Sequence, residues 1–208
     1  MKITSIKVRR KPKQSRARFT QDALMDSFVQ LLLEKEATEI TIREITDLAG
    51  VGLGTFYEYF SQKEDLLALT IHHYVQRNAH SLQQAAETAL KQSTDLKTYI
   101  YTLIHLQIAP IIEQSRLWQK LFLLERQISN VDIYQKHYLQ HVQSWADTLK
   151  HYPDHMLIDI EWLALNIHRI SYGFISQTLM ISSHRPNWEQ LERDIQMGIS
   201  GYIQNIRH

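Results

Sequence analysis

The 208-residue sequence contains no cysteine, and this absence excludes several kinds of functional site. Disulfide bridges, zinc sites built on thiolates and cysteine nucleophiles all require a sulfhydryl group that the chain does not have. Glycine and proline, the residues that most often interrupt helices, occur only six and four times. Their scarcity, beside long runs rich in leucine, isoleucine, glutamine, glutamate and lysine, predicts an all-α protein.

Long apolar segments are also missing from the sequence. No stretch approaches the roughly 18 uncharged apolar residues of a membrane-spanning helix, so we expect no membrane partner. The N-terminus lacks the apolar core of a secretory signal, which favours a cytoplasmic location. The apolar and aromatic fractions, 44% and 10%, are typical of a folded chain rather than a disordered one.

The net charge is small, but the charges are unevenly distributed. The 23 basic and 22 acidic residues give a formal charge of +1. Residues 1–18 hold eight of the basic residues and no acidic one, so this segment carries +8. Residues 19–63, by contrast, carry −5. A segment in which like charges repel and few apolar groups can pack is predicted to be a flexible basic arm.

Local signals predict a helix-turn-helix in the first third of the chain. A first helix is expected over Thr20–Lys35, with Thr20 as its cap. Thr41 and Glu44 have the spacing of a capping box, in which each side chain accepts a hydrogen bond from the other residue's backbone N–H. Gly50 suits the left-handed residue that ends such a helix, and a short helix over residues 53–59 follows. Two short helices joined by a glycine-bearing turn are typical of this motif.

Further helices are expected along the rest of the chain. Ser61 and Glu64 repeat the capping-box spacing before a long helix that continues through Val75. Pro110 is expected to end the next helix, because proline lacks the backbone N–H that the helix needs. The remaining predicted helices begin at residue 95 and cover residues 95–107, 111–128, 131–151, 156–180 and 188–206.

The residues around the helix-turn-helix resemble the TetR family of transcriptional regulators. The resemblance covers roughly Leu24–Leu67, about a fifth of the chain, and its motifs keep the family's order and spacing. They are Thr41-Ile42-Arg43-Glu44-Ile45, Ala49-Gly50-Val51, Gly54-Thr55-Phe56-Tyr57-Glu58-Tyr59-Phe60 and Lys63-Glu64-Asp65-Leu66-Leu67. The resemblance implies an N-terminal three-helix DNA-binding domain, followed by a helical domain that dimerises and often binds a small molecule.

The charge pattern, the motif and the resemblance together divide the chain into three parts. We expect a basic arm over residues 1–18, a helix-turn-helix DNA-binding domain over residues 19–63, and a helical effector-binding and dimerisation domain over residues 64–208. The expected function is that of a repressor that binds a palindromic operator in double-stranded DNA as a homodimer. A small hydrophobic or aromatic effector is expected to release it.

The second helix of the motif is expected to read the DNA bases. In a helix-turn-helix this helix enters the major groove with its N-terminal residues at the base edges. Thr55 can hydrogen-bond a base or a phosphate, and Glu58 can accept a hydrogen bond from a cytosine amine. Leu53 and the Tyr57 ring can contact a thymine methyl group, beside Gly54. Phe56 and Phe60 are expected to face inward.

Contacts to the DNA backbone are expected on both sides of that helix. By resemblance, Thr41, Tyr59 and Lys63 lie where family members hold phosphate, and Arg43 lies where they touch backbone or base. Tyr57 and Tyr59 are both expected at the surface, where a phenolic hydroxyl can donate to phosphate. The basic arm is expected to contact the minor groove or the backbone through Arg9, Arg10, Lys11 and Lys13.

The central helices supply apolar walls with a few polar groups, as an effector pocket requires. An aromatic stripe at helical spacing also fits an ordinary core, and this alternative stays open. No cofactor is expected. The candidate effector-binding residues are Tyr101, His105, Trp118, Phe122, Trp162, Asn166, Arg169 and Tyr172.

The last two predicted helices favour a homodimer. The helix from residue 156 to 180 is apolar on several faces, so it needs cover on all of them. Two such helices and their symmetry mates would form a four-helix bundle with C2 symmetry. The alternative is that both helices only cover the core of one chain. The candidate interface residues are Gly173, Ser176, Trp188, Leu191, Ile195 and Tyr202.

Other functions have weaker support in the sequence. His137 and His141, four residues apart, share a helix face that could hold a divalent metal, but no carboxylate lies suitably beside them, so we expect no metal. Glycine-rich phosphate loops and local catalytic signatures are absent, so we expect no enzyme. The alternatives are a nonspecific DNA-architectural protein held by its arm, and a helical enzyme or metal-binding protein.

Overall fold

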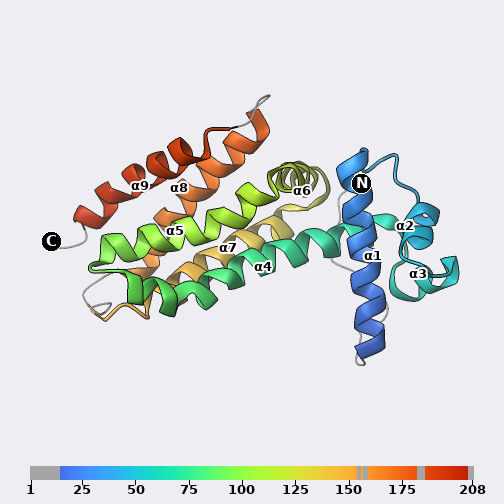
Figure 1. Cartoon of the computed structure of the whole chain (residues 1–208), viewed down its shortest axis with the longest axis horizontal. Helices are drawn as coiled ribbons and strands as arrows, with labels where there is room; N and C mark the ends of the chain where they lie inside the picture. Colours follow the sequence, from blue (N-terminus) through green and yellow to red (C-terminus); the bar gives the residue numbers. More distant parts are fainter. Residues whose placement is uncertain (1–14, 154–155, 157–158, 182–185, 206–208) are drawn as a thin grey trace. The chain divides into compact units, whose positions relative to one another are not determined.

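A computed structural model describes residues 15–153, 156, 159–181 and 186–205 of the chain. Within these residues there are nine α-helices and no β-strand, so the all-α prediction is confirmed (Figure 1). No helix in the described part is both long and apolar enough to cross a membrane. The helices are α1 (Ser15–Glu34), α2 (Ile42–Leu48), α3 (Leu53–Tyr59), α4 (Lys63–Gln92), α5 (Leu96–Glu113), α6 (Ser115–Ile128), α7 (Val131–Leu149), α8 (Ile160–Ile181) and α9 (Trp188–Asn205).

Polar side chains cap the start of five of these helices. In each case a side-chain oxygen accepts a hydrogen bond of 2.7–3.2 Å from the backbone N–H three residues later. Such bonds satisfy N–H groups that have no partner within the helix. The capping residues are Thr41, Asp95, Asn130, Asp159 and Asn187.

Several predicted helix boundaries are wrong, and those of α1 and α5 differ most. Helix α1 begins at Ser15 rather than Thr20, because the residues before Thr20 include good helix formers. Helix α5 continues through Pro110 to Glu113. The proline removes one hydrogen bond, but its carbonyl still accepts from the Gln114 N–H at 3.2 Å. Burial of the isoleucines on either side of it offsets the loss.

The start of α4 also differs from the predicted capping box. The Ser61 N–H donates to the Asp65 carboxylate at 3.0 Å, so the capping carboxylate comes from Asp65 rather than Glu64. Asp65 is buried and Glu64 is only half-buried, which explains why the deeper carboxylate takes this bond. Helix α4 then runs through Val75, as predicted, and ends at Gln92.

The described residues divide into two compact units. The N-terminal unit consists of the described residues up to Tyr74 together with Lys120–Tyr134. The C-terminal unit consists of Val75–Gln119 together with the described residues from Gln135 onward. The core of the N-terminal unit is made by side chains from α1, α2 and the region of α3. These side chains are fully buried, and they are Leu24, Phe28, Ile45, Phe56 and Phe60.

The C-terminal unit is a layered packing of helices. Helix α9 lies against both α5 and α8 (Figure 1). The Tyr99 hydroxyl donates to the Thr148 carbonyl at 2.9 Å, which joins α5 to the end of α7. Burial of this phenol raises its pKa to about 12. The unit's most deeply buried side chains include Ile104, Trp145, Ile167 and Ile195.

Candidate nucleic-acid interface

The turn between α2 and α3 has the geometry of a Schellman motif. Gly50 has φ of +68°, in the left-handed region that favours glycine. Its N–H donates to the Asp47 carbonyl at 3.3 Å, and the Val51 N–H donates to the Thr46 carbonyl at 3.0 Å. These two bonds close the end of α2 and direct the chain into α3. The predicted role of Gly50 is therefore confirmed.

Replacing Gly50 with alanine should lower the free energy of unfolding by about 1–2 kcal/mol, because an L-residue is disfavoured at this φ. A matched control is Gly54→Ala, since Gly54 lies within α3 and a Cβ there meets no atom within 4 Å. That change should stabilise the helix by about 0.5–1 kcal/mol. Urea denaturation measures the free energy of unfolding of both variants. An equal decrease for Gly54→Ala would contradict the role of Gly50 as a residue that requires the left-handed conformation.

Helix α3 exposes the side that the sequence assigns to DNA. Leu53 is 50% exposed and Tyr57 is 43% exposed, an unusual degree for such large apolar side chains. Gly54 and Glu58 are also exposed, and Thr55 is half-buried. Because positions three and four residues apart adjoin on a helix, these residues form one continuous outer face. We call Leu53, Gly54, Thr55, Tyr57 and Glu58 the reading face.

Tyr59 does not lie where the sequence analysis placed it. It is only 3% exposed, and its ring lies 6.3 Å from that of Phe60. Tyr59 follows Phe56 by three residues, so it shares the inward side of α3 rather than the side of Tyr57. The predicted surface position of Tyr59 is wrong, and its ring belongs to the core.

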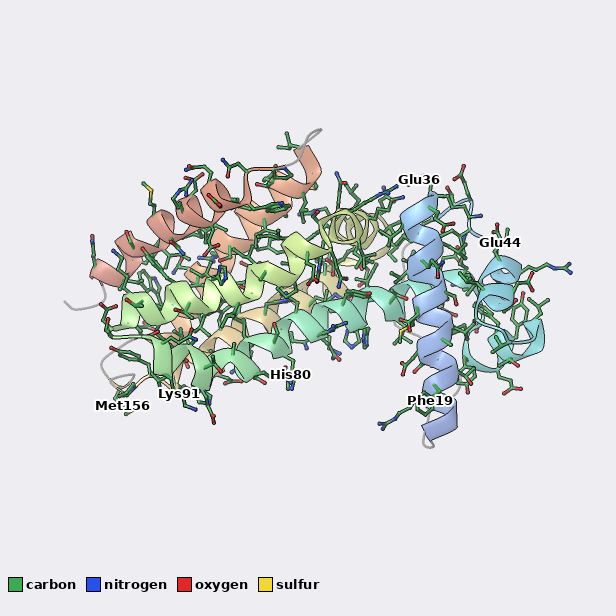
Figure 2. All side chains as sticks on the ribbon, in the orientation of Figure 1. Phe19, Glu36, Glu44, His80, Lys91 and Met156 are labelled. Atoms are coloured by element: carbon green, nitrogen blue, oxygen red, sulfur yellow. The ribbon has the colours of Figure 1, made fainter. Side chains whose placement is uncertain are left out.

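The capping box at the start of α2 is confirmed. The Thr41 Oγ accepts from the Glu44 N–H at 3.2 Å, and the Glu44 carboxylate accepts from the Thr41 N–H at 2.9 Å. Lys35 also pairs with this carboxylate. The hydrogen bond from Lys35, followed by those from Thr41, lowers the pKa of Glu44 to about 2. Figure 2 labels Glu44 on α2 and Glu36 near the end of α1.

The loop between α1 and α2 is held by two lysines. The Lys63 Nζ donates to the carbonyls of Ala37 and Ile40, both at 2.6 Å. The Lys120 Nζ donates to the Lys35 carbonyl at 2.9 Å and to the Glu36 carboxylate at 3.0 Å. Two of the three Lys63 donors are therefore used inside the protein, which weakens the prediction that Lys63 mainly holds phosphate. No sequence signal pointed to Lys120, because its partners lie about 84 residues away.

Two further predicted contacts lie at the surface. Thr41 is exposed beside the first turn of α2. The Arg43 side chain is 87% exposed and lies 3.9 Å from Asp47, a loose ion pair that leaves its guanidinium accessible. The predicted arm residues Arg9, Arg10, Lys11 and Lys13 lie outside the described residues.

Several of the predicted effector residues make contacts within the chain. The Tyr101 hydroxyl donates to the Gln196 carbonyl at 2.8 Å, and His105 lies 3.1 Å from the Glu192 carboxylate at the surface. Arg169 is exposed. Tyr101 and His105 join α5 to α9, and Arg169 faces solvent; a role of these residues in effector binding stays a prediction.

The other predicted effector residues have structural contacts of their own. Trp162 is 40% exposed, and its ring centroid lies 5.2 Å from that of Tyr202. Asn166 is buried, and its side-chain amide donates a hydrogen bond to the Trp162 carbonyl at 2.8 Å. Trp118 is buried, and Phe122 has the Arg126 guanidinium 5.9 Å from its ring centroid. Tyr172 alone lies in a cluster of rings, beside His168 and Tyr138.

A polar groove of about 450 Å³ lies between α4 and α7. Sequence analysis did not single out any residue of this groove. Figure 2 labels one of its members, His80, on α4. The lining residues are Gln76, Ala79, His80, Gln83, Gln140, Gln143, Ser144 and Asp147.

Three predicted dimer contacts are buried within a single chain. Leu191 is 6% exposed, Ile195 is 0% exposed and Ser176 is 2% exposed. They face the chain's own helices, because α9 uses its apolar stripe to cover α5 and α8. These three residues cannot meet a partner subunit, and that part of the prediction is wrong. Trp188, Gly173 and Tyr202 are half-buried.

Three apolar side chains of α8 and α9 that are not among the predicted interface residues are exposed. Ile181 is 72% exposed, Met197 is 71% exposed and Phe174 is 41% exposed. An apolar surface on helices at the end of a chain is typical of an interaction site. We call Phe174, Ile181 and Met197 the outer apolar face.

A profile of the "Bacterial regulatory proteins, tetR family" matches residues 24–69, the segment that holds the capped α2, the Schellman turn and α3. This segment belongs to the TetR family of DNA-binding domains. The match supports the prediction of a DNA-binding transcriptional regulator that is not an enzyme. A search of curated proteins finds no match.

Several solved structures share this fold over nearly their whole length. A TetR-family regulator from Mesorhizobium loti has 17% identity and a TM-score of 0.72, with 92% of this chain and 98% of that chain covered. The fatty acid degradation regulator FadR from Bacillus halodurans has 17% identity and a TM-score of 0.64, with 86% and 97% covered. SmeT in complex with triclosan has 16% identity and a TM-score of 0.60, with 89% and 90% covered.

Proposed function

We propose that this TetR-family protein is a repressor that binds a palindromic operator as a homodimer and is released by a small-molecule effector. The observation that carries the proposal is the reading face, which sets large side chains at the surface of α3 after a glycine-defined turn. Residues 19–63 would bind DNA, and residues 64–208 would bind the effector and the second subunit. A regulator of this kind acts on DNA, so we infer a cytoplasmic location.

The charge distribution supports different roles in DNA binding for residues 1–18 and residues 19–63. Residues 19–63 carry −5, so the reading face itself does not attract the phosphate backbone strongly. Residues 1–18 carry +8, and the last four of them form the start of α1, which begins at Ser15. We assign nonspecific attraction to this arm and sequence recognition to the reading face.

Replacing Arg9, Arg10, Lys11 and Lys13 with alanine should flatten the dependence of log affinity on log salt. Each phosphate contact that is lost reduces the slope by about 0.9. Titration of a labelled DNA duplex at several salt concentrations measures the slope for the wild type and the variant. A matched control that replaces the same number of exposed basic residues far along the chain should leave the slope unchanged. An unchanged slope for the arm variant would show that the arm does not contact DNA.

The outer apolar face supports the homodimer. Replacing Phe174 or Met197 with glutamate should shift the protein from dimer to monomer, because each introduces a charge at an apolar contact. Val131→Glu is the matched control, since Val131 is 73% exposed on another helix. Sedimentation velocity measures the oligomeric state. A dimer that survives both substitutions would contradict this interface.

The effector would release the protein from DNA if it binds more tightly to a conformation that has lower affinity for DNA. A ligand shifts a conformational equilibrium only when its affinities for the two conformations differ. Helix α4 contributes residues to both compact units, so it offers a continuous route for such coupling. The complex of the neighbouring SmeT with triclosan supports a small-molecule effector for this chain too. Sequencing the DNA that the purified protein selects from a random pool tests the function as a whole.

A further inference from the structure

Helix α1 ends without the left-handed residue that closes many helices. In the described part of the chain only Gly50 has a positive φ, and it follows α2 rather than α1. The last carbonyl groups of a helix have no donor within the helix and need donors from elsewhere. The residues that follow α1 therefore depend on donors from other parts of the chain. We call residues 35–41 the α1–α2 loop.

Two ammonium groups supply donors to the α1–α2 loop. The Lys120 Nζ, from α6, donates to the Lys35 carbonyl at 2.9 Å. The Lys63 Nζ, from the start of α4, donates to the carbonyls of Ala37 and Ile40 at 2.6 Å each. A cation at the C-terminal end of a helix is also favoured by the helix dipole. Lysines from two other helices thus replace the glycine that would otherwise close α1.

The α1–α2 loop leads directly into the part of α2 that is expected to contact DNA. The Lys35 side chain pairs with the Glu44 carboxylate, which also accepts from the Thr41 N–H at 2.9 Å. Thr41 is the cap of α2, and Arg43, whose side chain is 87% exposed, lies in its first turn. Hydrogen bonds therefore connect Lys120, through Lys35 and Glu44, to the residue that starts α2.

The Lys120 side chain is directed at the protein rather than at solvent. It is 17% exposed, and two of its three N–H donors are used, at the Lys35 carbonyl and at the Glu36 carboxylate. The Glu36 side chain is 76% exposed, so this ion pair contributes little. A hydrogen bond from a charged donor to a backbone carbonyl contributes more. The bond to the Lys35 carbonyl is therefore the more important of the two.

We propose that Lys120 is a positioning residue for operator binding: through the Lys35 carbonyl it holds the α1–α2 loop where Thr41 and Arg43 meet the DNA backbone. Without this donor the loop loses its bond to α6, and the start of α2 is held less firmly. Binding contacts depend on side chains that their surroundings hold in place. The inference rests on the proposed function for its effect on DNA binding, whereas the effect on the loop is a property of the free protein.

Amide hydrogen exchange in the free full-length protein provides the first test. Lys120→Met keeps much of the side chain's length and removes its ammonium group. The amides of Glu39, Glu44 and Ile45 are hydrogen-bonded in the loop or just after it. In Lys120→Met they should exchange at least about fivefold faster than in the wild type, while amides of the C-terminal unit keep their rates.

The matched control for this test is Lys150→Met. Lys150 also pairs with a carboxylate, that of Asp147 at 3.3 Å, and its replacement changes the net charge by the same amount. This variant should leave the exchange of Glu39, Glu44 and Ile45 unchanged. Wild-type rates at these amides in Lys120→Met, or an equal acceleration throughout its chain, would overturn the proposal.

DNA binding provides the second test, with the duplex that the wild-type protein selects from a random pool and an unrelated duplex of equal length. Lys120→Met should bind the selected duplex roughly tenfold more weakly and the unrelated duplex almost as the wild type does. Lys120→Arg restores a charged donor, and Glu36→Gln removes only the exposed charge. Each should bind the selected duplex within about threefold of the wild type. A tenfold loss in either variant would overturn the assignment to the Lys35 carbonyl.

The salt dependence separates positioning from a direct phosphate contact. The slope of log affinity against log salt should be the same for Lys120→Met and the wild type. A slope reduced by about 0.9 would show that Lys120 binds phosphate, and it would overturn the proposal.

The two tests also separate this inference from the proposed function. A protein that selects no DNA sequence would overturn the proposed function and the role of Lys120 in operator binding, while faster exchange in Lys120→Met would still establish its hold on the loop. If the wild type selects a sequence and Lys120→Met binds that sequence equally well, this inference fails and the proposed function stands.

Discussion

Replacing Tyr57 with alanine should weaken binding to the selected operator by roughly one to two orders of magnitude, the usual range for loss of a good base contact. Tyr57 is 43% exposed on the reading face, and its ring meets Phe56 edge-on at 5.5 Å. Truncation therefore removes groove contacts while the buried Phe56 keeps α3 in place. Affinity for unrelated DNA should change by less than about threefold, because phosphate contacts dominate nonspecific binding.

Fluorescence anisotropy with operator and unrelated duplexes, at one salt concentration, measures both affinities. The matched control is Tyr59→Phe, which removes only a hydroxyl from a ring that is 3% exposed. It should leave both affinities close to those of the wild type. An equal loss on both duplexes for Tyr57→Ala would favour the nonspecific architectural protein instead.

Acidification from pH 7 to pH 5 should cost the fold roughly 2 kcal/mol through His168 alone. The unfolded histidine binds a proton below its ordinary pKa of 6.5, whereas burial and the charge of His141 hold the folded pKa at about 3. The unfolded state thus binds more protons between these values. Stability is lost as the pH falls from 6.5 towards 3.

Urea denaturation of the wild type and His168→Phe at both pH values measures this contribution. The phenylalanine variant keeps a ring among His141, Tyr138 and Tyr172 but has no proton to bind. On acidification, the free energy of unfolding of His168→Phe should fall less than that of the wild type, by roughly 2 kcal/mol. His80→Phe, at an exposed position, is the matched control. Equal losses for wild type and His168→Phe would show that His168 does not resist protonation.

The sequence predicts the helix-turn-helix well because its signals are local. The Thr41–Glu44 capping box and the left-handed Gly50 each depend on residues within four positions. The bounds of α3, Leu53–Tyr59, match the predicted helix for the same reason. Tyr59 was misplaced because an aromatic motif does not show which rings face the core, whereas the three-residue spacing from Phe56 does.

The packing of the C-terminal unit could not be predicted in the same way, because its contacts join residues that are distant in sequence. Asn78 and His141 are 63 residues apart, and Asn78 and Gln107 are 29 apart. Neither hydrophobic periodicity nor motif spacing in the sequence predicts contacts between residues so far apart. The dimer prediction failed in part for a related reason. The apolar stripe of α9 is satisfied within the chain at Ile195, and the exposed apolar side chains, such as Met197, lie on its other side.

Selection of double-stranded DNA from a random pool by the purified full-length protein tests the central claim most directly. The reading face predicts enrichment of an inverted repeat whose half-sites lie about one helical turn apart or somewhat more. Thr55→Ala and Tyr57→Ala should bind DNA and yet fail to enrich that repeat. A wild-type protein that retains DNA but leaves the pool as random as the input would contradict the claim.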